Sequence, residues 1–387
     1  MTYNLRKLQE ADLKDRKVIM RVDYDVVKDG KIKDDDRLLK SLPTIQHILL
    51  NGAKQLILIA HNGKPKGTID AALSLRPVLA WLEDNLEEEV EFIDDCIQES
   101  LPDNPRVLLL ENLRFHEEEK ANGEAFAKKL ASYADIYVGN AFATAHRAHA
   151  SMVGIPKYLP SYAGLILQRE VEMLSKVTES PERPFHAIVG FAKISDKIMV
   201  LEKLLEKADK LLVGGAVVFT FFKAQGLEVG KSLVEDEKLD VAKDLLARHG
   251  DKIVLPVDIV VADDFEGRNP QTCGIDSIPN DKAGLDLGEK TAERYNGILT
   301  DAKTVFWNGP VGMFEVKPFD AATNTIAEFL GASGKTVIIG GGDTTKAMKN
   351  AGVYEELTHV STGGGASLEF IQGKELPGLR VLSEGRT

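Results

Sequence analysis

Short apolar runs alternate with longer amphipathic segments along the whole 387-residue chain. In the first half, the apolar runs occupy residues 17–24, 54–61, 90–94, 106–113 and 135–142. In the second half, they occupy residues 186–191, 210–215, 253–261, 304–309, 336–341 and 358–362. Runs of this form are typical of buried parallel strands, and the segments between them have the spacing of helices that cover a sheet. The pattern therefore predicts an α/β fold with parallel sheets flanked by helices.

The length of the chain predicts two domains, because a single hydrophobic core seldom serves more than about 250–300 residues. Residues 163–179 have the pattern of one long helix, and a proline-containing breaker follows at 180–184. We expect this helix to join an N-terminal domain, residues 1–165, to a C-terminal domain, residues 166–367. The apolar residues of the tail, 368–387, are expected to pack on the first domain.

Composition excludes several classes of function. The formal net charge is −12 at pH 7, which disfavours a broad surface for nucleic acid or anionic lipid. No apolar run approaches the roughly 20 residues of a membrane span, and the N-terminus lacks a signal peptide's apolar stretch. The two cysteines, Cys96 and Cys273, are far apart and show no zinc-binding spacing. We expect a cytoplasmic protein that binds neither membrane nor nucleic acid.

Glycine clusters follow four of the predicted strands in the second half, at residues 189–193, 213–216, 339–345 and 361–367. A turn from strand to helix often needs glycine for steric reasons alone. Glycine also lets a phosphate approach the backbone, and the following helix presents its positive dipole end. Four clusters in one half favour nucleotide binding over the steric explanation.

The common nucleotide motifs are absent. GKT at 334–336 precedes a strand and lacks the upstream glycine of a P-loop, and no GxGxxG follows a strand. Asp343 opens a predicted helix, where it would either cap the helix or hold Mg²⁺ between phosphates. Lys193 and Lys197 lie near another helix start, where they would either be solvated or bind a phosphate. The glycine context favours the ligand-binding role for all three.

Charged residues follow the strands of the first half in place of glycine. They are Asp23, Asp25, Arg37, His61, Arg114, His146, Arg147 and His149. Singly, each is more often a surface or capping residue, but together they would meet at one edge of the sheet and suit a small polyanion. Zinc binding by His146 and His149 is a minor alternative, since their spacing alone suggests it. No order of Ser, His and Asp indicates a hydrolase.

The chain resembles the phosphoglycerate kinase family along essentially its whole length. The strings that carry the resemblance are RVDYDV, DDDRLLKSLPTI, AHNGKPKG, LLLENLRFHEEEKAN, AFATAHRAHASMVG, AKISDK, KAQGLEVGKSL, LPVDIVVADDF, GLDLGEKT, WNGPVGMFE, GGGDTT and STGGGASLEF. The resemblance implies two Rossmann-like domains joined by a hinge helix, in a monomeric, hinge-bending, glycolytic enzyme. The first domain would bind 3-phosphoglycerate or 1,3-bisphosphoglycerate, and the second would bind ATP or ADP with Mg²⁺.

Site residues follow from the same resemblance, position by position. The acid substrate would be held by Asp23, Tyr24, Asp25, Arg37, His61, Asn62, Gly63, Lys64, Arg114 and Arg147. The nucleotide would be held by Lys193, Lys197, Gly214, Gly215, Gly288, Asn308, Glu315, Gly341, Gly342, Asp343 and Thr344, with Glu315 on the ribose and Asp343 on the metal. Arg37, Lys193, Gly364 and Gly365 would stabilise the phosphoryl group during direct in-line transfer.

Several positions depart from the family pattern. They are Tyr24, Asp25, Val27, Ala60, Asn62, Lys64, Asn140 and Phe191. Asp25 places a carboxylate where the family has asparagine, and Lys64 lacks the planar fork of the usual arginine, so both should weaken substrate binding. Phe191 would either obstruct the nucleotide or pack over the sheet. Two alternatives stay open: a diverged paralogue that only binds nucleotide or phospho-acid, and a kinase for a different small carboxylic acid.

Overall fold

The computed structural model describes residues 3–195 and 197–383. The chain forms two compact units. The first unit comprises Met1–Glu172 and Glu375–Thr387, and the second comprises Met173–Lys374. Helix α5 (Leu165–Thr178) contains the point at which the chain passes from the first unit to the second. Of the terminal segments assigned above to the first domain, residues 1–2 and 384–387 lie outside the described residues.

The first unit is built on a six-stranded sheet in the order β5-β6-β4-β1-β7-β8. Every pair of neighbours is parallel. The strands are β1 (Lys17–Arg21), β4 (Gln55–Ile59), β5 (Val90–Ile93), β6 (Val107–Leu110), β7 (Ile136–Gly139) and β8 (Ser161–Ala163). A hairpin of β2 (Val27–Lys28) and β3 (Lys31–Ile32) follows β1. The central strands are buried throughout, as continuous apolar runs predict.

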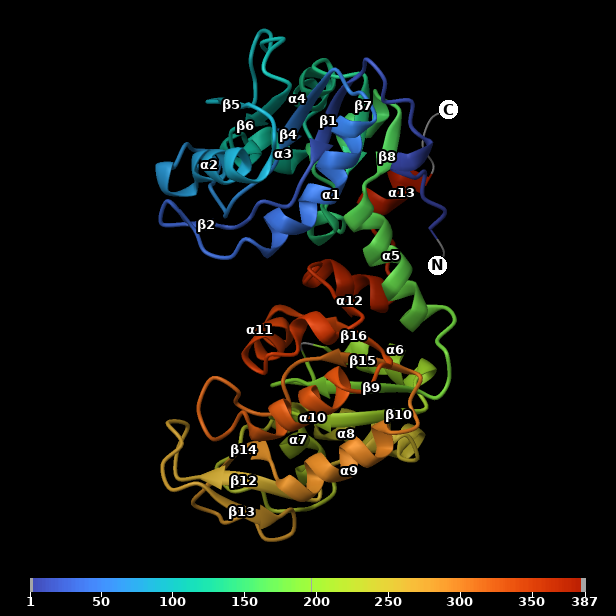
Figure 1. Ribbon diagram of the computed structural model, residues 1–387. Helices are drawn as coiled ribbons and strands as arrows, with labels where there is room; N and C mark the ends of the chain where they lie inside the picture. Colours follow the sequence, from blue (N-terminus) through green and yellow to red (C-terminus); the bar gives the residue numbers. More distant parts are fainter. Residues whose placement is uncertain (1–2, 196, 384–387) are drawn as a thin grey trace. The chain divides into compact units, whose positions relative to one another are not determined.

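Helices flank this sheet (Figure 1). They are α1 (Asp36–Leu50), α2 (Arg76–Asn85), α3 (Glu117–Ala121), α4 (Glu124–Ala131) and α13 (Pro377–Ser383), with short helical turns η1 (Leu8–Glu10), η2 (Ala71–Leu73), η3 (Leu113–Phe115), η4 (Phe142–Thr144), η5 (Ala150–Gly154) and η6 (Ile155–Lys157). Helix α13 comes from the end of the chain. Its Gly378 N–H donates to the carbonyl of Ala145 at 2.8 Å, and the carbonyl of Leu382 accepts from the N–H of Arg6 at 3.3 Å.

The second unit contains a parallel sheet in the order β11-β10-β9-β15-β16-β17. Its strands are β9 (Phe185–Gly190), β10 (Lys210–Gly214), β11 (Ile253–Val254), β15 (Thr304–Asn308), β16 (Thr336–Gly340) and β17 (His359–Val360). Numbered along the chain, this order is 3-2-1-4-5-6, that of a doubly wound dinucleotide-binding fold. The winding reverses between β9 and β15, where such sheets bind ligands beyond the carboxyl ends of the strands.

Helices flank the second sheet as well (Figure 1). They are α6 (Ile198–Lys207), α7 (Val217–Ala224), α8 (Leu239–His249), α9 (Glu289–Leu299), α10 (Ala321–Gly331), α11 (Gly342–Asn350) and α12 (Gly365–Ile371), with the turns η7 (Asp236–Lys238) and η8 (Tyr354–Glu356). The predicted α/β class with parallel sheets flanked by helices is confirmed. None of the helices in the described residues is long and apolar enough to cross a membrane.

One part of the second unit differs from the expected pattern. The run at 253–261 is two strands that belong to different sheets, because Pro256 between them cannot donate a ladder hydrogen bond. The second of these, β12 (Asp258–Ala262), is the centre of a small antiparallel sheet with β13 (Gln271–Gly274) and β14 (Ala283–Leu287). Strands β2, β3, β8, β13 and β14 lie outside the predicted runs; two of the four residues of β13 are exposed, and the strand lacks an apolar run.

Candidate active site

Arg37 and Asp23 form an ion pair at the carboxyl edge of the first sheet. Asp23 follows β1, Arg37 lies in the first turn of α1, and Arg37 Nη1 lies 3.2 Å from each carboxylate oxygen. Burial raises the pKa of Asp23, while the positive charges of Arg37 and Arg21 oppose that rise. The ion pair therefore holds the guanidinium of Arg37 in place beside the ends of the strands.

Arg21 is a buried residue of this edge that the sequence alone does not single out. It ends β1, is fully buried, and donates from Nη2 to His61 Nδ1 at 2.7 Å. Its Nε donates to Ser151 Oγ at 2.9 Å, and that hydroxyl donates to the buried Glu119 Oε1 at 2.6 Å. A chain of buried hydrogen bonds thus runs from Glu119 to His61. The one signal in the sequence was a charged residue inside an apolar strand.

The cations of the first unit converge, as their places after successive strands predict. Burial lowers the pKa of His61 well below its usual value, and the nearby charges of Arg21, Arg114, His149 and Arg37 lower it further. Burial, followed by Arg114, Arg21 and Arg147, lowers the pKa of His149 to about 4. We call these six side chains the cationic cluster: Arg21, Arg37, His61, Arg114, Arg147 and His149.

Arg114 contributes an incompletely satisfied guanidinium to this cluster. Its Nη1 donates to the carbonyl of Gly63 at 2.7 Å, while its buried Nε has no hydrogen-bond partner among the described residues. Burial and the charge of Arg21 lower the pKa of Arg114. Such an arrangement favours an incoming anion, because the anion supplies both the missing acceptor and the missing charge.

Five residues predicted to bind the acid substrate, including Arg147 of the cationic cluster, differ from one another in their surroundings. Tyr24 is buried with its hydroxyl 3.0 Å from Ser41 Oγ, and the amide of Asn62 is bonded to both backbone groups of Val27. Both side chains therefore stabilise the fold beneath the cluster. Asp25 Oδ1 accepts from the N–H of Gly63 at 2.8 Å. Lys64 and Arg147 are exposed at the surface of the first unit.

The second unit has a pocket of about 370 Å³ at the reversal point between β9 and β15. It brings together residues from three of the four glycine clusters. The predicted residues that line it are Lys193, Lys197, Asn308, Gly341, Gly342, Asp343, Thr344, Gly364 and Gly365. We call this cavity the glycine-turn pocket. The helices α11 and α12 begin at this pocket, since Gly342 and Gly365 line it.

Close backbone approach explains the glycines of this pocket. A Cβ on Gly309 would lie 2.0 Å from the carbonyl oxygen of Gly190, and Gly309 has φ +92°. Gly341 has φ +95° and turns the chain from β16 into α11. Asn308 Nδ2 donates to the carbonyl of Gly340 at 2.6 Å, and Thr344 Oγ1 accepts from the N–H of Gly309 at 2.7 Å. Asn308 and Thr344 therefore fix the positions of the two turns.

Asp343 fits the part of a metal ligand. It lies in the first turn of α11, is exposed, and lines the glycine-turn pocket. No hydrogen bond or ion pair within the described residues occupies its carboxylate. Mg²⁺ is bound in proteins through one or two carboxylates together with substrate phosphates. A carboxylate that faces the pocket and has no partner matches that donor set.

A second pocket of about 280 Å³ adjoins the first and shares Phe191 and Asp343 with it. We call it the apolar pocket; it is lined mainly by carbon, with Glu315 at its exposed side. Phe191 is 5% exposed and lines both cavities, so its ring is packed into the wall. Gly214 and Gly288 line neither the glycine-turn pocket nor the apolar pocket. The missing Cβ of Gly214 leaves room for Val311, and that of Gly288 leaves room for Asp258.

Glu235 is a second residue that the sequence analysis missed. It is buried, and its carboxylate accepts from the backbone N–H groups of Ile194 and Ser195 and from the hydroxyl of Ser195. It therefore anchors the loop that carries Lys193 towards the glycine-turn pocket. In the sequence, Glu235 lies in an acidic run that looks like a solvated surface.

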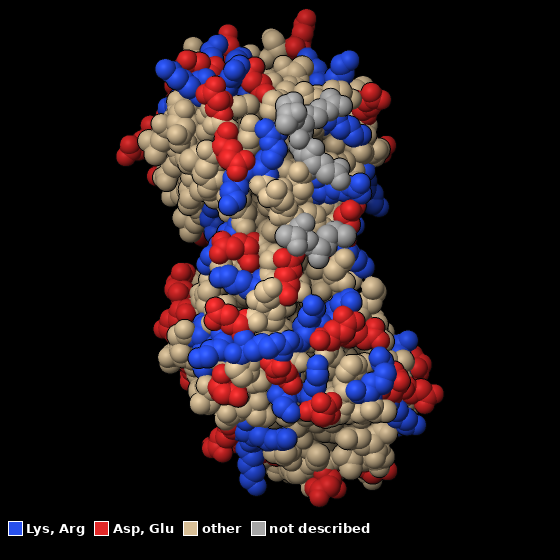
Figure 2. All heavy atoms as spheres, turned by 90° about the vertical axis from the view of Figure 1, so that its right-hand side faces the viewer, with Lys and Arg blue, Asp and Glu red and all other residues tan. Residues whose placement is uncertain are grey.

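One face of the molecule shows how charged side chains are distributed away from the pockets. On the face drawn in Figure 2, basic and acidic side chains are interspersed over both units. The chain as a whole has a formal net charge of −12 at pH 7.

Comparisons with known proteins agree with this geometry. The sequence profile described as phosphoglycerate kinase matches residues 8–374. The phosphoglycerate kinase of Acaryochloris marina (strain MBIC 11017) is 48% identical, with 98% of each chain covered. The chloroplastic phosphoglycerate kinase of Volvox carteri is also 48% identical, over 97% of this chain and 85% of that protein.

Solved structures give the same result. The structure of phosphoglycerate kinase from Coxiella burnetii matches with a TM-score of 0.91 and 38% identity, covering 98% of this chain and 99% of that one. The structure from Pyrococcus horikoshii OT3 matches with a TM-score of 0.84 and 31% identity, covering 98% of each chain. The predicted fold and enzyme class are confirmed. The chain belongs to the phosphoglycerate kinase family.

Proposed function

We propose that this chain transfers a phosphoryl group reversibly between 1,3-bisphosphoglycerate and ADP, forming 3-phosphoglycerate and ATP. The cationic cluster carries the proposal. Six basic side chains lie near one sheet edge, and burial together with the charges of the neighbouring arginines lowers the pKa of His61 and His149. An anionic substrate with separate carboxyl and phosphate groups offsets those charges at several points.

The acid substrate in this proposal lies against the cationic cluster. Arg114 and Arg147 hold the phosphate end, and Arg37 lies beside the acyl group that gains or loses the phosphoryl group. His61, held by Arg21, is neutral and donates a hydrogen bond from Nε2. Asp23 keeps Arg37 oriented through their ion pair.

The nucleotide in this proposal lies in the two adjoining cavities of the second unit. Its base and ribose occupy the apolar pocket, with Glu315 on the ribose, and its phosphates occupy the glycine-turn pocket. Lys193 and Lys197 neutralise phosphate charge. Asp343 would hold Mg²⁺, which neutralises charge on the nucleotide phosphates when bound.

Direct transfer requires the two substrates to meet without a covalent enzyme intermediate. Catalysis then depends on position and on charge stabilisation by Arg37, Lys193 and the backbone N–H groups that begin α12. We further propose hinge-bending closure by a monomeric, cytoplasmic enzyme. Small-angle X-ray scattering should show the radius of gyration falling only when both substrates are present.

Asp25 and Lys64 supply the test that separates this function from its alternatives. We would assay Mg-ATP with 3-phosphoglycerate in a coupled reaction, comparing the parent with the double variant Asp25→Asn, Lys64→Arg. Turnover by the parent supports the proposal. Turnover by the double variant alone would indicate a diverged binding module, and ATP binding without turnover in either would indicate a different acid acceptor.

A further inference from the structure

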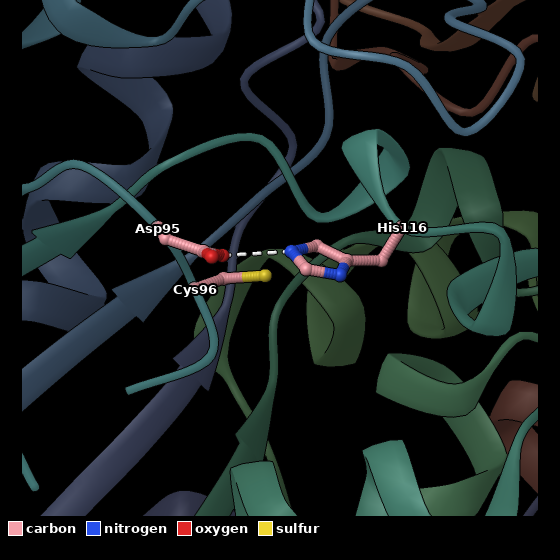
Figure 3. Close-up of side chains that lie close together, drawn as sticks. All are labelled: Asp95, Cys96 and His116. Carbon is pink, nitrogen blue, oxygen red and sulfur yellow. Dashed lines mark hydrogen bonds and ion pairs between the residues drawn. The ribbon is translucent and has the colours of Figure 1, made fainter. Parts of the chain in front are cut away.

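Three potential metal ligands lie together at the outer part of the first sheet: Asp95, Cys96 and His116. One ligand atom from each lies within 4.8 Å of the other two. Figure 3 shows the three side chains directed towards one another, from two different segments of the chain. It is the one group of at least three His, Cys, Asp or Glu side chains with this geometry in residues 3–195 and 197–383.

The sheet explains why these residues meet. Strands β5 and β6 are parallel neighbours, with Ile93 opposite Leu110. Asp95 and Cys96 follow the end of β5, while His116 follows β6 and the turn η3, at the N-cap of α3. Carboxyl ends of adjacent parallel strands lie at the same edge, so the two loops are held side by side.

The loop that carries the first two ligands is well fixed. Asp95 Oδ1 accepts from the backbone N–H of Ile97 at 3.1 Å. The hydroxyl of Tyr133 accepts from the N–H of Gln98 at 2.7 Å and donates to its carbonyl at 2.8 Å. The backbone of this loop is therefore held in place before any ion arrives, which lowers the entropy lost on binding.

We propose that Asp95, Cys96 and His116 form a binding site for Zn²⁺. Thiolate sulfur, imidazole nitrogen and carboxylate oxygen are the ligand types that Zn²⁺ takes in proteins, whereas Mg²⁺ does not favour sulfur. Three protein ligands leave a fourth position for water. The Asp95 side chain is 47% exposed, so solvent reaches the group from that side while Cys96 is buried.

The present distances suit the ion after small side-chain movements. His116 Nε2 lies 2.7 Å from Asp95 Oδ1, the length of a hydrogen bond. Tetrahedral Zn²⁺, with bonds of about 2.0–2.3 Å, would separate its ligand atoms by roughly 3.3–3.7 Å. Binding therefore opens the contact between His116 and Asp95 and draws in the sulfur. The thiol of Cys96 releases its proton to solvent, and His116 binds through Nε2 as the neutral tautomer that carries its proton on Nδ1.

This site is separate from the proposed Mg²⁺ ligand, Asp343, which belongs to the second unit. Zinc at His116 would also tie down the start of α3. That helix carries Glu119, the end of the buried chain of hydrogen bonds to His61. We therefore expect the ion to stabilise the folded first unit, since it binds the native loops and not the unfolded chain.

The test uses the full chain, freed of metal with EDTA and without nucleotide, titrated with Co²⁺ and then Zn²⁺. One equivalent of Co²⁺ should produce a thiolate-to-cobalt charge-transfer band, which Zn²⁺ should abolish by displacement. The band should vanish in Cys96→Ser and persist in Cys273→Ser, the matched control. Excess Zn²⁺ should raise the Tm of the parent and of Cys273→Ser but not that of Cys96→Ser.

Two more variants keep the proposal falsifiable should Cys96→Ser fail to fold. Asp95→Asn and His116→Gln change partly exposed side chains and should each weaken Zn²⁺ binding at least tenfold, as measured by competition with a chromogenic chelator. The proposal is wrong if the parent shows no charge-transfer band. It is also wrong if the band survives in Cys96→Ser, or if both other variants bind Zn²⁺ like the parent. In those cases the group is a hydrogen-bonded ion pair packed on a thiol.

Discussion

Arg21 and His61 are joined by a buried hydrogen bond of 2.7 Å. Because a guanidinium can only donate, Nδ1 of His61 is the acceptor and the ring proton resides on Nε2. That nitrogen lies 3.7 Å from the carboxylate of Asp25. The pair therefore fixes one neutral tautomer of His61 at the edge of the cationic cluster.

The first prediction concerns the protonation of His61. Its pKa lies well below the usual value because of burial and the surrounding arginines, so the ring should not titrate between pH 6 and 8. Binding of 3-phosphoglycerate should raise the pKa, since the anion offsets those charges. Long-range ¹H–¹⁵N NMR spectra, assigned with His61→Asn, would report both. A midpoint near 6.5 in the free protein would contradict the assigned tautomer and environment.

The second prediction concerns Arg37. Replacing it with alanine removes the cation proposed for the moving phosphoryl group, and it leaves Asp23 buried without its ion-pair partner. We expect kcat to fall by at least about 100-fold, the scale seen when a preorganised charge is removed from a transition state. Lys40→Ala is the control, because Lys40 lies on the same helix in an ion pair with Asp36. Its kcat should stay within about twofold, as expected of a surface pair.

The third prediction tests Glu235 as a positioning residue. Glu235→Gln removes the negative charge that strengthens the hydrogen bonds from the two loop N–H groups to Oε2, and it replaces one of the two acceptor oxygens by an NH₂ group. The loop that carries Lys193 should loosen, and the Kd for Mg-ATP should rise about tenfold, equivalent to about 1.4 kcal/mol. Binding of 3-phosphoglycerate should be unchanged. Calorimetry would measure both Kd values in Glu235→Gln and in the exposed control Glu237→Gln. If Glu235→Gln weakened the binding of both ligands, Glu235 would have a merely structural role.

The sequence predicts which residues lie close together when they follow neighbouring strands of a sheet. The parallel sheets follow from apolar runs, and the meeting of Arg37, His61 and Arg114 follows from their places after neighbouring strands. Arg21 and Glu235 could not be predicted. Their partners lie about 40 residues away along the chain, and only the packed fold shows that these charges are buried.

The sequence departures at Asp25 and Phe191 show the same limit. Asp25 was expected to weaken substrate binding by its charge, and the structure adds a contact to the N–H of Gly63 that its sequence context does not reveal. The sequence allows Phe191 either to obstruct the nucleotide or to pack over the sheet. Its burial in the wall of two cavities depends on β9, β15 and α7 meeting, which no local pattern specifies.

The fourth prediction concerns Asp286, which lines the apolar pocket. Burial raises its pKa to about 8, so the folded state keeps a proton that the unfolded state releases above about pH 4. The group's contribution to stability is therefore complete below pH 4 and is lost as pH rises towards 8. In the parent, the free energy of unfolding should therefore fall by a few kcal/mol over that range, since one pKa unit corresponds to about 1.4 kcal/mol. In Asp286→Asn this fall should be absent.

Urea denaturation at pH 5 and pH 8.5 would measure this effect. The parent and the exposed control Asp281→Asn should both lose more stability between these pH values than Asp286→Asn does. An equal loss in all three proteins would show that Asp286 ionises normally in the folded state.

The fifth prediction distinguishes two glycines of the second unit. A Cβ at Gly309 would meet the backbone of Gly190, which cannot rotate away, and φ +92° is itself strained for alanine. Gly309→Ala should therefore lower the free energy of unfolding by about 2–5 kcal/mol and weaken ATP binding.

Gly297 lies exposed within α9, with no heavy atom within 4 Å of an added Cβ. Gly297→Ala should instead stabilise the protein by about 0.5–1 kcal/mol, because alanine restricts the unfolded chain and favours the helix. A Gly309→Ala variant as stable as the parent would show that the close approach of β9 and β15 does not exclude a side chain at Gly309.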